Sequence, residues 1–181
     1  LIVCPKMLLE KWKTELKEKF NFNFKIYDRK KDLIAELNSG TVKGIVNYES
    51  IRSSEDKKEE NNPLLRMLSE QNVKFDLILC DEAHRLRNSD TQTYKGAEIL
   101  LPFSTSVVFL TATPIMISEE NLFNLLYLLD NQQFANKEIF QSYLSVNKPF
   151  ITAISQLNNK VRLTEIADNI YDWNQRVKSE R

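Results

Sequence analysis

Apolar and polar residues follow two different rhythms along this chain. Short apolar or alternating runs predict buried strands, and they lie at residues 1–5, 24–27, 44–48, 75–80 and 106–111. Apolar residues spaced three or four apart predict amphipathic helices, and they lie at residues 7–20, 31–37, 91–101, 119–129, 137–144 and 163–177. A polar run at 52–62 reads as an exposed loop, and Pro63 is expected to begin one more helix after it.

This alternation of strands and helices predicts an α/β fold, in which a parallel sheet is covered on both faces by helices. The sequence changes character at about Phe134, and beyond it only helical spacing is found. We therefore expect two parts, an α/β domain over residues 1–133 and a helical extension over residues 134–181.

The composition narrows the classes of function. Lys and Arg number 25, as do Asp and Glu, so the net charge is zero and gives no support for a nucleic-acid partner, although it leaves room for a local basic patch. With two cysteines, no Cys-x-x-Cys and one histidine, neither a disulfide scaffold nor a zinc site is expected. No apolar run is long enough to span a bilayer and no signal peptide is visible. An intracellular protein without a membrane partner is favoured.

The strand predicted at 75–80 is followed directly by the residues best suited to bind a metal ion or to catalyse a reaction. Asp81 and Glu82 follow it directly, and His84 is the only histidine of the chain. Ligands collect at the carboxyl ends of strands in open parallel sheets, and Mg²⁺ prefers one or two carboxylates together with water and substrate phosphates. Asp81 would hold the hydrated ion, and Glu82 would orient or deprotonate an attacking water. On this stretch alone, a strand that merely ends in a solvated acidic turn explains the pattern equally well.

Two blocks of the sequence are typical of one large class of motor proteins. Residues 81–88 begin Asp-Glu-Ala-His and resemble the Walker B, or DEAH, motif, and residues 110–115 (Leu-Thr-Ala-Thr-Pro-Ile) resemble motif III. They lie about 30 residues apart, and each ends a predicted strand. The chain thus resembles the first motor lobe of superfamily-two helicases and translocases, closest to the Swi/Snf-type branch and its bacterial helicase relatives.

Further blocks extend the resemblance over roughly residues 1–130. Residues 1–6, with the helix that carries Trp12 and Glu15, resemble motif Ia, and residues 44–49 resemble the strand-and-turn motif that follows it. The leucine-rich helix at 119–130 resembles the one that follows motif III in the Swi/Snf-type branch. Trp12 itself is expected to lie in the core.

The resemblance implies a RecA-like lobe of the P-loop NTPase class that uses ATP and Mg²⁺. It implies that Asp81 positions Mg²⁺ through water on the phosphates of ATP and that Glu82 activates the hydrolytic water. It also implies that His84 links the nucleotide site to motif III through Thr111 or Thr113.

The resemblance further implies contacts with nucleic acid. Lys6 and the start of the helix behind it would bind phosphate, because cations and helix amino ends suit phosphate. Tyr48, Arg85 and Arg87 are the other expected contacts. Lys6 reads equally well as an ordinary surface lysine, Tyr48 as a packed residue, and Arg85 and Arg87 as residues that merely solvate their loop.

One part of the family pattern is missing from this sequence. No G-x-x-x-x-G-K-[ST] segment occurs, whereas the resemblance places that phosphate-binding loop and its strand just before motif Ia; the second motor lobe is missing as well. We therefore expect the chain to be part of a longer protein and inactive in ATP hydrolysis by itself. In the family the missing strand lies beside the motif III strand, so residues 106–111 would form an exposed apolar edge. Such edges invite pairing, and self-association or marginal stability is expected.

The function implied by the resemblance is that of an ATP-dependent DNA translocase or remodelling ATPase that moves on double-stranded DNA. Two alternatives remain open. One is an RNA helicase, or the motor subunit of a restriction or repair system, in the same superfamily. The other is a non-catalytic scaffold that keeps the lobe to bind protein or nucleic acid. A cytoplasmic, bacterial-type protein is expected rather than a nuclear one.

Overall fold

The computed structural model describes residues 1–37, 42–53, 68, 74–112, 118–158 and 163–179. The chain divides into two compact units, Leu1–Gln133 and Phe134–Arg181. The exposed loop expected at 52–62 and the helix expected from Pro63 fall largely outside the described residues, although Leu68 is described as buried and helical.

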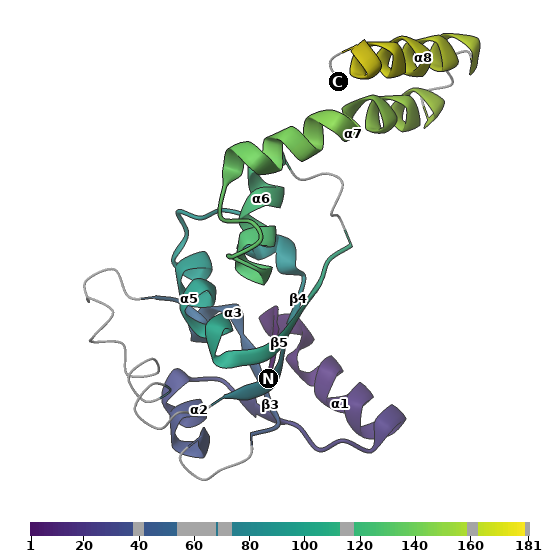
Figure 1. Ribbon diagram of the computed structural model, residues 1–181. Helices are drawn as coiled ribbons and strands as arrows, with labels where there is room; N and C mark the ends of the chain where they lie inside the picture. The colour runs from purple at the N-terminus through teal and green to yellow at the C-terminus, as the bar shows by residue number, and fades with distance from the viewer. Residues whose placement is uncertain (38–41, 54–67, 69–73, 113–117, 159–162, 180–181) are drawn as a thin grey trace. The chain divides into compact units, whose positions relative to one another are not determined.

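A five-stranded parallel sheet forms the centre of the first unit (Figure 1), with the strand order β2-β3-β1-β4-β5. The strands are β1 Ile2–Cys4, β2 Lys25–Tyr27, β3 Gly44–Asn47, β4 Phe75–Asp81 and β5 Ser104–Leu110. Each pairing between neighbouring strands is parallel. The predicted α/β fold with a parallel sheet is therefore confirmed, and all five predicted strands are present.

Helices cover both faces of the sheet. On one face lies α1, which packs Leu9 and Trp12 into a cluster with strand residues such as Ile45. The helices of the other face contribute to a larger cluster that includes Leu33, Tyr48 and Tyr94; Figure 1 shows α1 on the opposite side of the strands from α2, α3 and α5. The helical elements of this unit are η1 Lys6–Leu8, α1 Leu9–Phe20, α2 Lys30–Leu37, α3 Tyr48–Ile51, η3 Ala83–Leu86, α5 Gln92–Leu100, η4 Leu101–Phe103 and α6 Glu119–Leu129.

Side chains of β4 and β5 alternate between these two faces, as strand geometry requires. Ile78, Cys80, Val107 and Phe109 pack in the larger cluster. Leu79 packs toward the α1 side, and its neighbour in the register is Val108. The α1 face therefore also carries further alternate positions of the two strands, among them Leu77, Asp81, Ser106 and Leu110. On that face Leu77, Val108 and Leu110 are 42%, 39% and 39% exposed.

The chain turns sharply where the third strand was expected to continue. Tyr48 does not extend β3 but begins the short helix α3. The side chain of Asn47 caps this helix, because its Oδ1 accepts hydrogen bonds from the backbone N–H of Ser50 at 2.8 Å and from the Ser50 hydroxyl at 2.9 Å. The cap turns the Tyr48 side chain into the core, where it is 2% exposed.

Two helices make up the second unit, α7 (Lys137–Asn158) and α8 (Leu163–Ser179), and they pack against each other. The first is longer than the predicted 137–144, and Phe140, Ala153 and Ile166 are the buried apolar residues described here. Among the described residues of the whole chain, no helix is long and apolar enough to cross a membrane.

Candidate functional site

The end of β4 brings the expected acidic residues to the carboxyl edge of the sheet. Asp81 is the last residue of the strand, and η3 begins at Ala83. Between them, Glu82 has φ 53° and ψ 46°, a left-handed conformation that residues with a side chain seldom adopt. The chain therefore turns directly after β4, and the carboxylates of Asp81 and Glu82 both lie at the end of the strand.

Asp81 is held from three directions by neutral donors. Its Oδ1 accepts the backbone N–H of Glu82 at 2.9 Å, and its Oδ2 accepts the indole N–H of Trp12 at 2.8 Å. The hydroxyl of Tyr48 donates to the backbone carbonyl of Asp81 at 2.7 Å. The carboxylate is thus oriented on both oxygens by donors that carry no charge.

Two neighbouring groups stay neutral beside this carboxylate. Burial, and then the charge of Asp81, raises the pKa of the Cys4 thiol to about 12. Burial, followed by the nearby Cys80 and Asp81, raises the pKa of the Tyr48 phenol above its ordinary value. At neutral pH Tyr48 therefore keeps the proton that it donates, and no thiolate competes with Asp81 for a cation.

His84 lies against Glu82. Its Nδ1 is 3.2 Å from Glu82 Oε2, a distance that makes an ion pair when the imidazole is protonated. The two atoms are not aligned for a hydrogen bond, and the buried Nδ1 therefore has no hydrogen-bond partner among the described residues. The distance places the two side chains together at the end of β4.

The expected link from His84 to motif III stays a prediction. Thr111 follows the end of β5 directly and is half-buried. Thr113, the second expected partner, lies outside the described residues.

Cations gather along the same edge of the sheet, next to the acidic turn. Lys6 and Arg85 line one hollow of about 410 Å³ together with Glu49. Lys6 and Glu49 also line a second hollow, of about 360 Å³, with Asp28, Arg29 and Arg52. We call these four cations, Lys6, Arg29, Arg52 and Arg85, the cationic edge.

Two members of the cationic edge, Lys6 and Arg85, are predicted from the sequence, whereas Arg29 and Arg52 are not. Arg29 lies two residues beyond β2, where it also pairs with Asp32 at 2.9 Å, and Arg52 directly follows α3. In the sequence, the feature that could have identified Arg29 and Arg52 is that each follows an element that ends at this edge. The strand order was needed to use it, because β1 lies between β3 and β4 in the sheet although it precedes both β2 and β3 in the sequence.

Two expected nucleic-acid contacts differ in their placement. Tyr48 is buried and its hydroxyl is used on Asp81, so its side chain does not face a ligand at the surface; of the two readings of this residue, packing is the one that agrees with the structure. Arg87 is exposed, and its backbone carbonyl accepts the side-chain amide of Asn124 on α6 at 2.9 Å. Its side chain is accessible, but it does not line either hollow of the cationic edge.

The residues at the end of β4 fit a weakly held Mg²⁺ rather than a metal bound by protein alone. Within the described ranges, no three His, Cys, Asp or Glu residues group as a metal cage. Each oxygen of Asp81 accepts one hydrogen bond and keeps a further lone pair. A single oriented carboxylate of this kind suits Mg²⁺ that keeps its waters and takes other ligands from phosphate.

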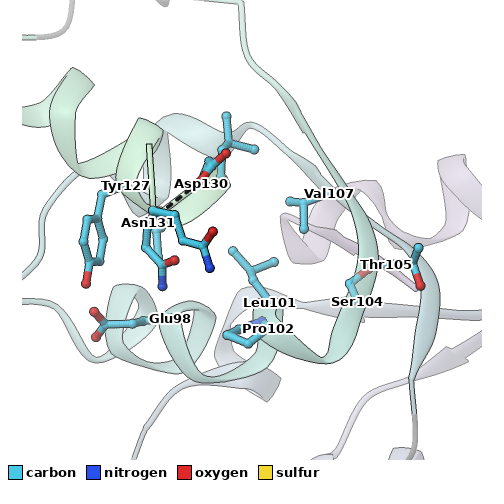
Figure 2. A pocket seen from close by; sticks show the side chains of 12 residues that line it. Glu98, Leu101, Pro102, Ser104, Thr105, Val107, Tyr127, Asp130 and Asn131 are labelled. Carbon is cyan, nitrogen blue, oxygen red and sulfur yellow. Dashed lines mark hydrogen bonds between the residues drawn. The ribbon is translucent and has the colours of Figure 1, made fainter. Parts of the chain in front are cut away.

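Another pocket, of about 260 Å³, lies away from this site (Figure 2). It is lined by Ser104 and Val107 from the first half of β5 and by residues at the end of α6 such as Tyr127 and Asp130. Because the strands are parallel, the start of β5 lies at the edge of the sheet opposite to Asp81. This pocket is therefore not part of the acidic turn or the cationic edge.

Comparison with known proteins gives a consistent picture. The family described as the SNF2-related domain matches residues 1–171. The RNA polymerase-associated protein RapA of Yersinia pseudotuberculosis (strain IP 31758) is 30% identical over 168 residues, which are 91% of this chain and 17% of that protein. RapA of Vibrio vulnificus (strain CMCP6) is 29% identical over 172 residues, 93% of this chain and 17% of that protein. The chain thus spans about 17% of the length of these relatives.

One solved structure shares the fold. The Sulfolobus solfataricus SWI2/SNF2 ATPase core in complex with dsDNA matches with a TM-score of 0.53 and 18% identity, over 94% of this chain and 32% of that one. At this level of identity the likeness concerns the fold, an α/β arrangement around a parallel sheet.

Proposed function

The chain belongs to the SNF2-related domain family, and we propose on this basis that it is part of the first motor lobe of an ATP-dependent translocase that moves on double-stranded DNA. The observation that carries the proposal is the geometry at the end of β4. There Asp81 is oriented by three neutral donors, and Glu82 is turned beside it by a left-handed backbone.

The acidic turn has a defined role in this proposal. Asp81 would hold a hydrated Mg²⁺ through its free lone pairs, and Mg²⁺, when bound, neutralises charge on the phosphates of ATP. Glu82 would accept a proton from, or orient, the attacking water, because its carboxylate lies one residue beyond Asp81 at the same strand end. His84, at 3.2 Å from Glu82, would fix the direction of that carboxylate.

The cationic edge supports a nucleic-acid partner. Lys6, Arg29 and Arg85 lie at the carboxyl ends of three different strands, so together they offer spaced positive charge of the kind that phosphates require. We favour double-stranded DNA because the structural neighbour is a complex with dsDNA. The relatives are named for an association with RNA polymerase, and a partner of that kind is a second possibility for the longer protein.

The chain alone is expected to be inactive. It has no G-x-x-x-x-G-K-[ST] segment, and a backbone nest with a lysine is what cradles nucleotide phosphates in P-loop enzymes. In the longer protein that segment would supply the remaining phosphate contacts. A motor subunit that acts on RNA or in restriction or repair, and a scaffold without catalysis, are the alternatives that the test must separate.

Steady-state ATP hydrolysis by the full-length protein tests the proposal. We expect stimulation by double-stranded DNA above that by single-stranded DNA or RNA, and a loss of about 10²–10⁴-fold in Glu82→Gln, because the general base is removed. Glu98→Gln makes the same chemical change on the exposed side of α5 and should behave as wild type. Stimulation by RNA alone would favour the RNA-helicase alternative. If the folded protein hydrolyses no ATP under any condition, the result would favour the alternative of a scaffold without catalysis.

A further inference from the structure

Trp12 makes a contact that its expected place in the core does not explain. Its ring packs at the edge of the α1 cluster, near Leu9 and Ile45, and is half-buried. Its indole N–H, however, points to the strand end and donates to Asp81 Oδ2 at 2.8 Å, across 69 residues of sequence. A packing role would be served by the ring alone, and it would not require the only polar atom of the side chain to meet this carboxylate.

We propose that Trp12 is a positioning residue for the nucleotide site, which fixes the Asp81 carboxylate in the orientation that receives hydrated Mg²⁺. This inference rests on the proposed function, because it assigns Trp12 a role at the same site. Trp12 would touch neither Mg²⁺ nor ATP and would act only through Asp81.

The two hydrogen bonds on the carboxylate act as a pair. The N–H of Glu82 holds Oδ1 and the indole holds Oδ2, so rotation about the last bond of the Asp81 side chain breaks one or both. With Oδ1 alone held, the carboxylate could turn about that single contact. Both donors are needed to fix the plane of the carboxylate, and hence the direction of the remaining lone pairs.

An indole suits this role better than a charged side chain would. Indole is a donor only and carries no charge, so it orients the carboxylate without neutralising it. A lysine or arginine in its place would form an ion pair and compete with Mg²⁺ for the same negative charge. The ring is also rigid, and its packing against the cluster that includes Ile45 sets the direction of the N–H before any ligand arrives.

Solvent still reaches the neighbourhood of this contact. A cavity of about 130 Å³ is lined by Leu8, Lys11, Glu15, Trp12 and Asp81. Besides Asp81, the charged residues of this lining are Lys11 and Glu15, both on α1, and Glu15 is engaged with Lys19 at 3.0 Å. Asp81 is therefore held firmly but not sealed, as a carboxylate that meets a hydrated ion must be.

Two substitutions of Trp12 in the full-length protein separate its hydrogen bond from its ring. Trp12→Phe keeps an aromatic ring and removes the donor. Trp12→His keeps a ring nitrogen in nearly the place of the indole nitrogen and removes the second ring; at pH 8 the imidazole is neutral and able to donate. Tyr94→Phe, which removes a buried hydroxyl whose contact is to the Asn124 carbonyl, is the matched control for the loss of one aromatic donor elsewhere in the same unit.

The readouts are the Mg²⁺ concentration that half-saturates ATP hydrolysis and, without turnover, the Mg²⁺ dependence with which a fluorescent ADP analogue binds. Loss of a residue that orients a metal ligand typically weakens metal binding by about tenfold or more. We expect Trp12→Phe to raise the half-saturating Mg²⁺ concentration about tenfold in both assays, with Trp12→His close to wild type and Tyr94→Phe unchanged.

Other results overturn the inference. Wild-type Mg²⁺ dependence in Trp12→Phe would show that the hydrogen bond is not needed. An equal defect in both Trp12 variants would assign the effect to ring packing. If Trp12→Phe does not fold, Trp12→His still decides, because a Mg²⁺ requirement raised as much as tenfold in a variant that keeps the donor contradicts the proposal. If wild-type protein shows no Mg²⁺-dependent nucleotide binding, the proposed function fails first, and this inference fails with it.

Discussion

Glu82 has a backbone conformation that costs about 1–2 kcal/mol for a residue with a side chain. Its φ of 53° is set where the chain leaves β4, and the hydrogen bond from its own N–H to Asp81 Oδ1 helps to offset that cost. The two acidic residues are thus coupled, since the turn that exposes Glu82 also orients Asp81. A strained residue of this kind is more typical of a functional site than of an ordinary turn.

The hydroxyl of Tyr48 supports the same turn through its hydrogen bond to the Asp81 carbonyl, and substitution of Tyr48 tests this support. Tyr48→Phe removes the donor that lies 2.7 Å from the partly buried carbonyl of Asp81. We expect the free energy of unfolding of the chain to fall by about 1–2 kcal/mol, measured by urea denaturation. Because the side chain is buried, DNA affinity of the full-length protein should not change.

The control for this experiment is Tyr171→Phe, which makes the same chemical change at a residue that is 63% exposed. Equal stability of Tyr48→Phe and wild type would argue against a supporting role for the hydroxyl. A loss of DNA affinity without a loss of stability would restore Tyr48 as a nucleic-acid contact.

At this scale the sequence predicted what is local. Asp81, Glu82 and His84 stand next to one another in the chain, and an apolar run that ends in two acids is visible without a structure. The contact of Trp12 with Asp81 spans 69 residues. Helical spacing places Trp12 on the inner side of its helix, but it does not say which atom of the ring meets which strand.

At the scale of helices, α3 and α5 approach each other closely because Gly96 has no side chain. A Cβ added to Gly96 on α5 would lie 1.9 Å from the carbonyl oxygen of Ile51, the last residue of α3. The backbone N–H of Ser53 also donates to the Gln92 carbonyl at 3.0 Å, so the two helices are joined at backbone level. α3 in turn carries Tyr48, and therefore this approach supports the acidic turn.

Gly96→Ala is expected to destabilise the chain, although alanine is the better helix former. The added methyl meets backbone atoms, which cannot move aside as a flexible side chain can, and α5 must shift away from α3. We expect the free energy of unfolding to fall by about 2–3 kcal/mol. Lys95→Ala, on the exposed side of the same helix, should leave it within about 0.5 kcal/mol of wild type. An unchanged or raised melting temperature for Gly96→Ala would contradict the close approach.

Element by element, hydrophobic periodicity predicted the positions of all five strands but not every boundary. Val46, Asn47 and Tyr48 read as one continuing strand, because a tyrosine suits a strand as well as a helix start. The strand ends at Asn47 because the side chain of this residue caps α3, and hydrophobic periodicity does not reveal such a hydrogen bond. The cationic edge was only half predicted for a similar reason, since Arg29 and Arg52 join Lys6 through the order of the strands.

At the scale of the whole molecule, the connections between strands follow one hand. α1 connects β1 to β2, away from β5, and lies on one face, whereas α5 connects β4 to β5 in the opposite direction and lies on the other. Right-handed crossovers require this pairing of direction and face. A strand added beside β5 and joined by a helix to β1 would run in the direction of α1. Its helix would then cover the α1 face of β4 and β5, where Leu77, Val108 and Leu110 are exposed.

We therefore expect different assembly states for the 181-residue chain and for the full-length protein. Among the described residues β5 is the last strand of the sheet, so we expect its outer edge to pair with a second copy. Light scattering should show that the isolated chain self-associates as its concentration rises. The full-length protein should not, if a preceding strand and helix cover the same edge and face. Val108→Lys should keep the isolated chain monomeric, because a charge on an edge strand opposes pairing.

Ile139→Lys is the matched control for that experiment, since it adds the same charge at an exposed apolar residue of the second unit, 52% exposed, and should leave self-association unchanged. If both lysine variants dissolve the assembly equally, net charge and not the β5 edge controls it. A chain that stays monomeric at every concentration would mean that the edge of β5 is not available for pairing. In that case slow hydrogen exchange at the β5 amides would identify the strand as covered, and a segment other than a preceding strand and its helix would lie over the α1 face.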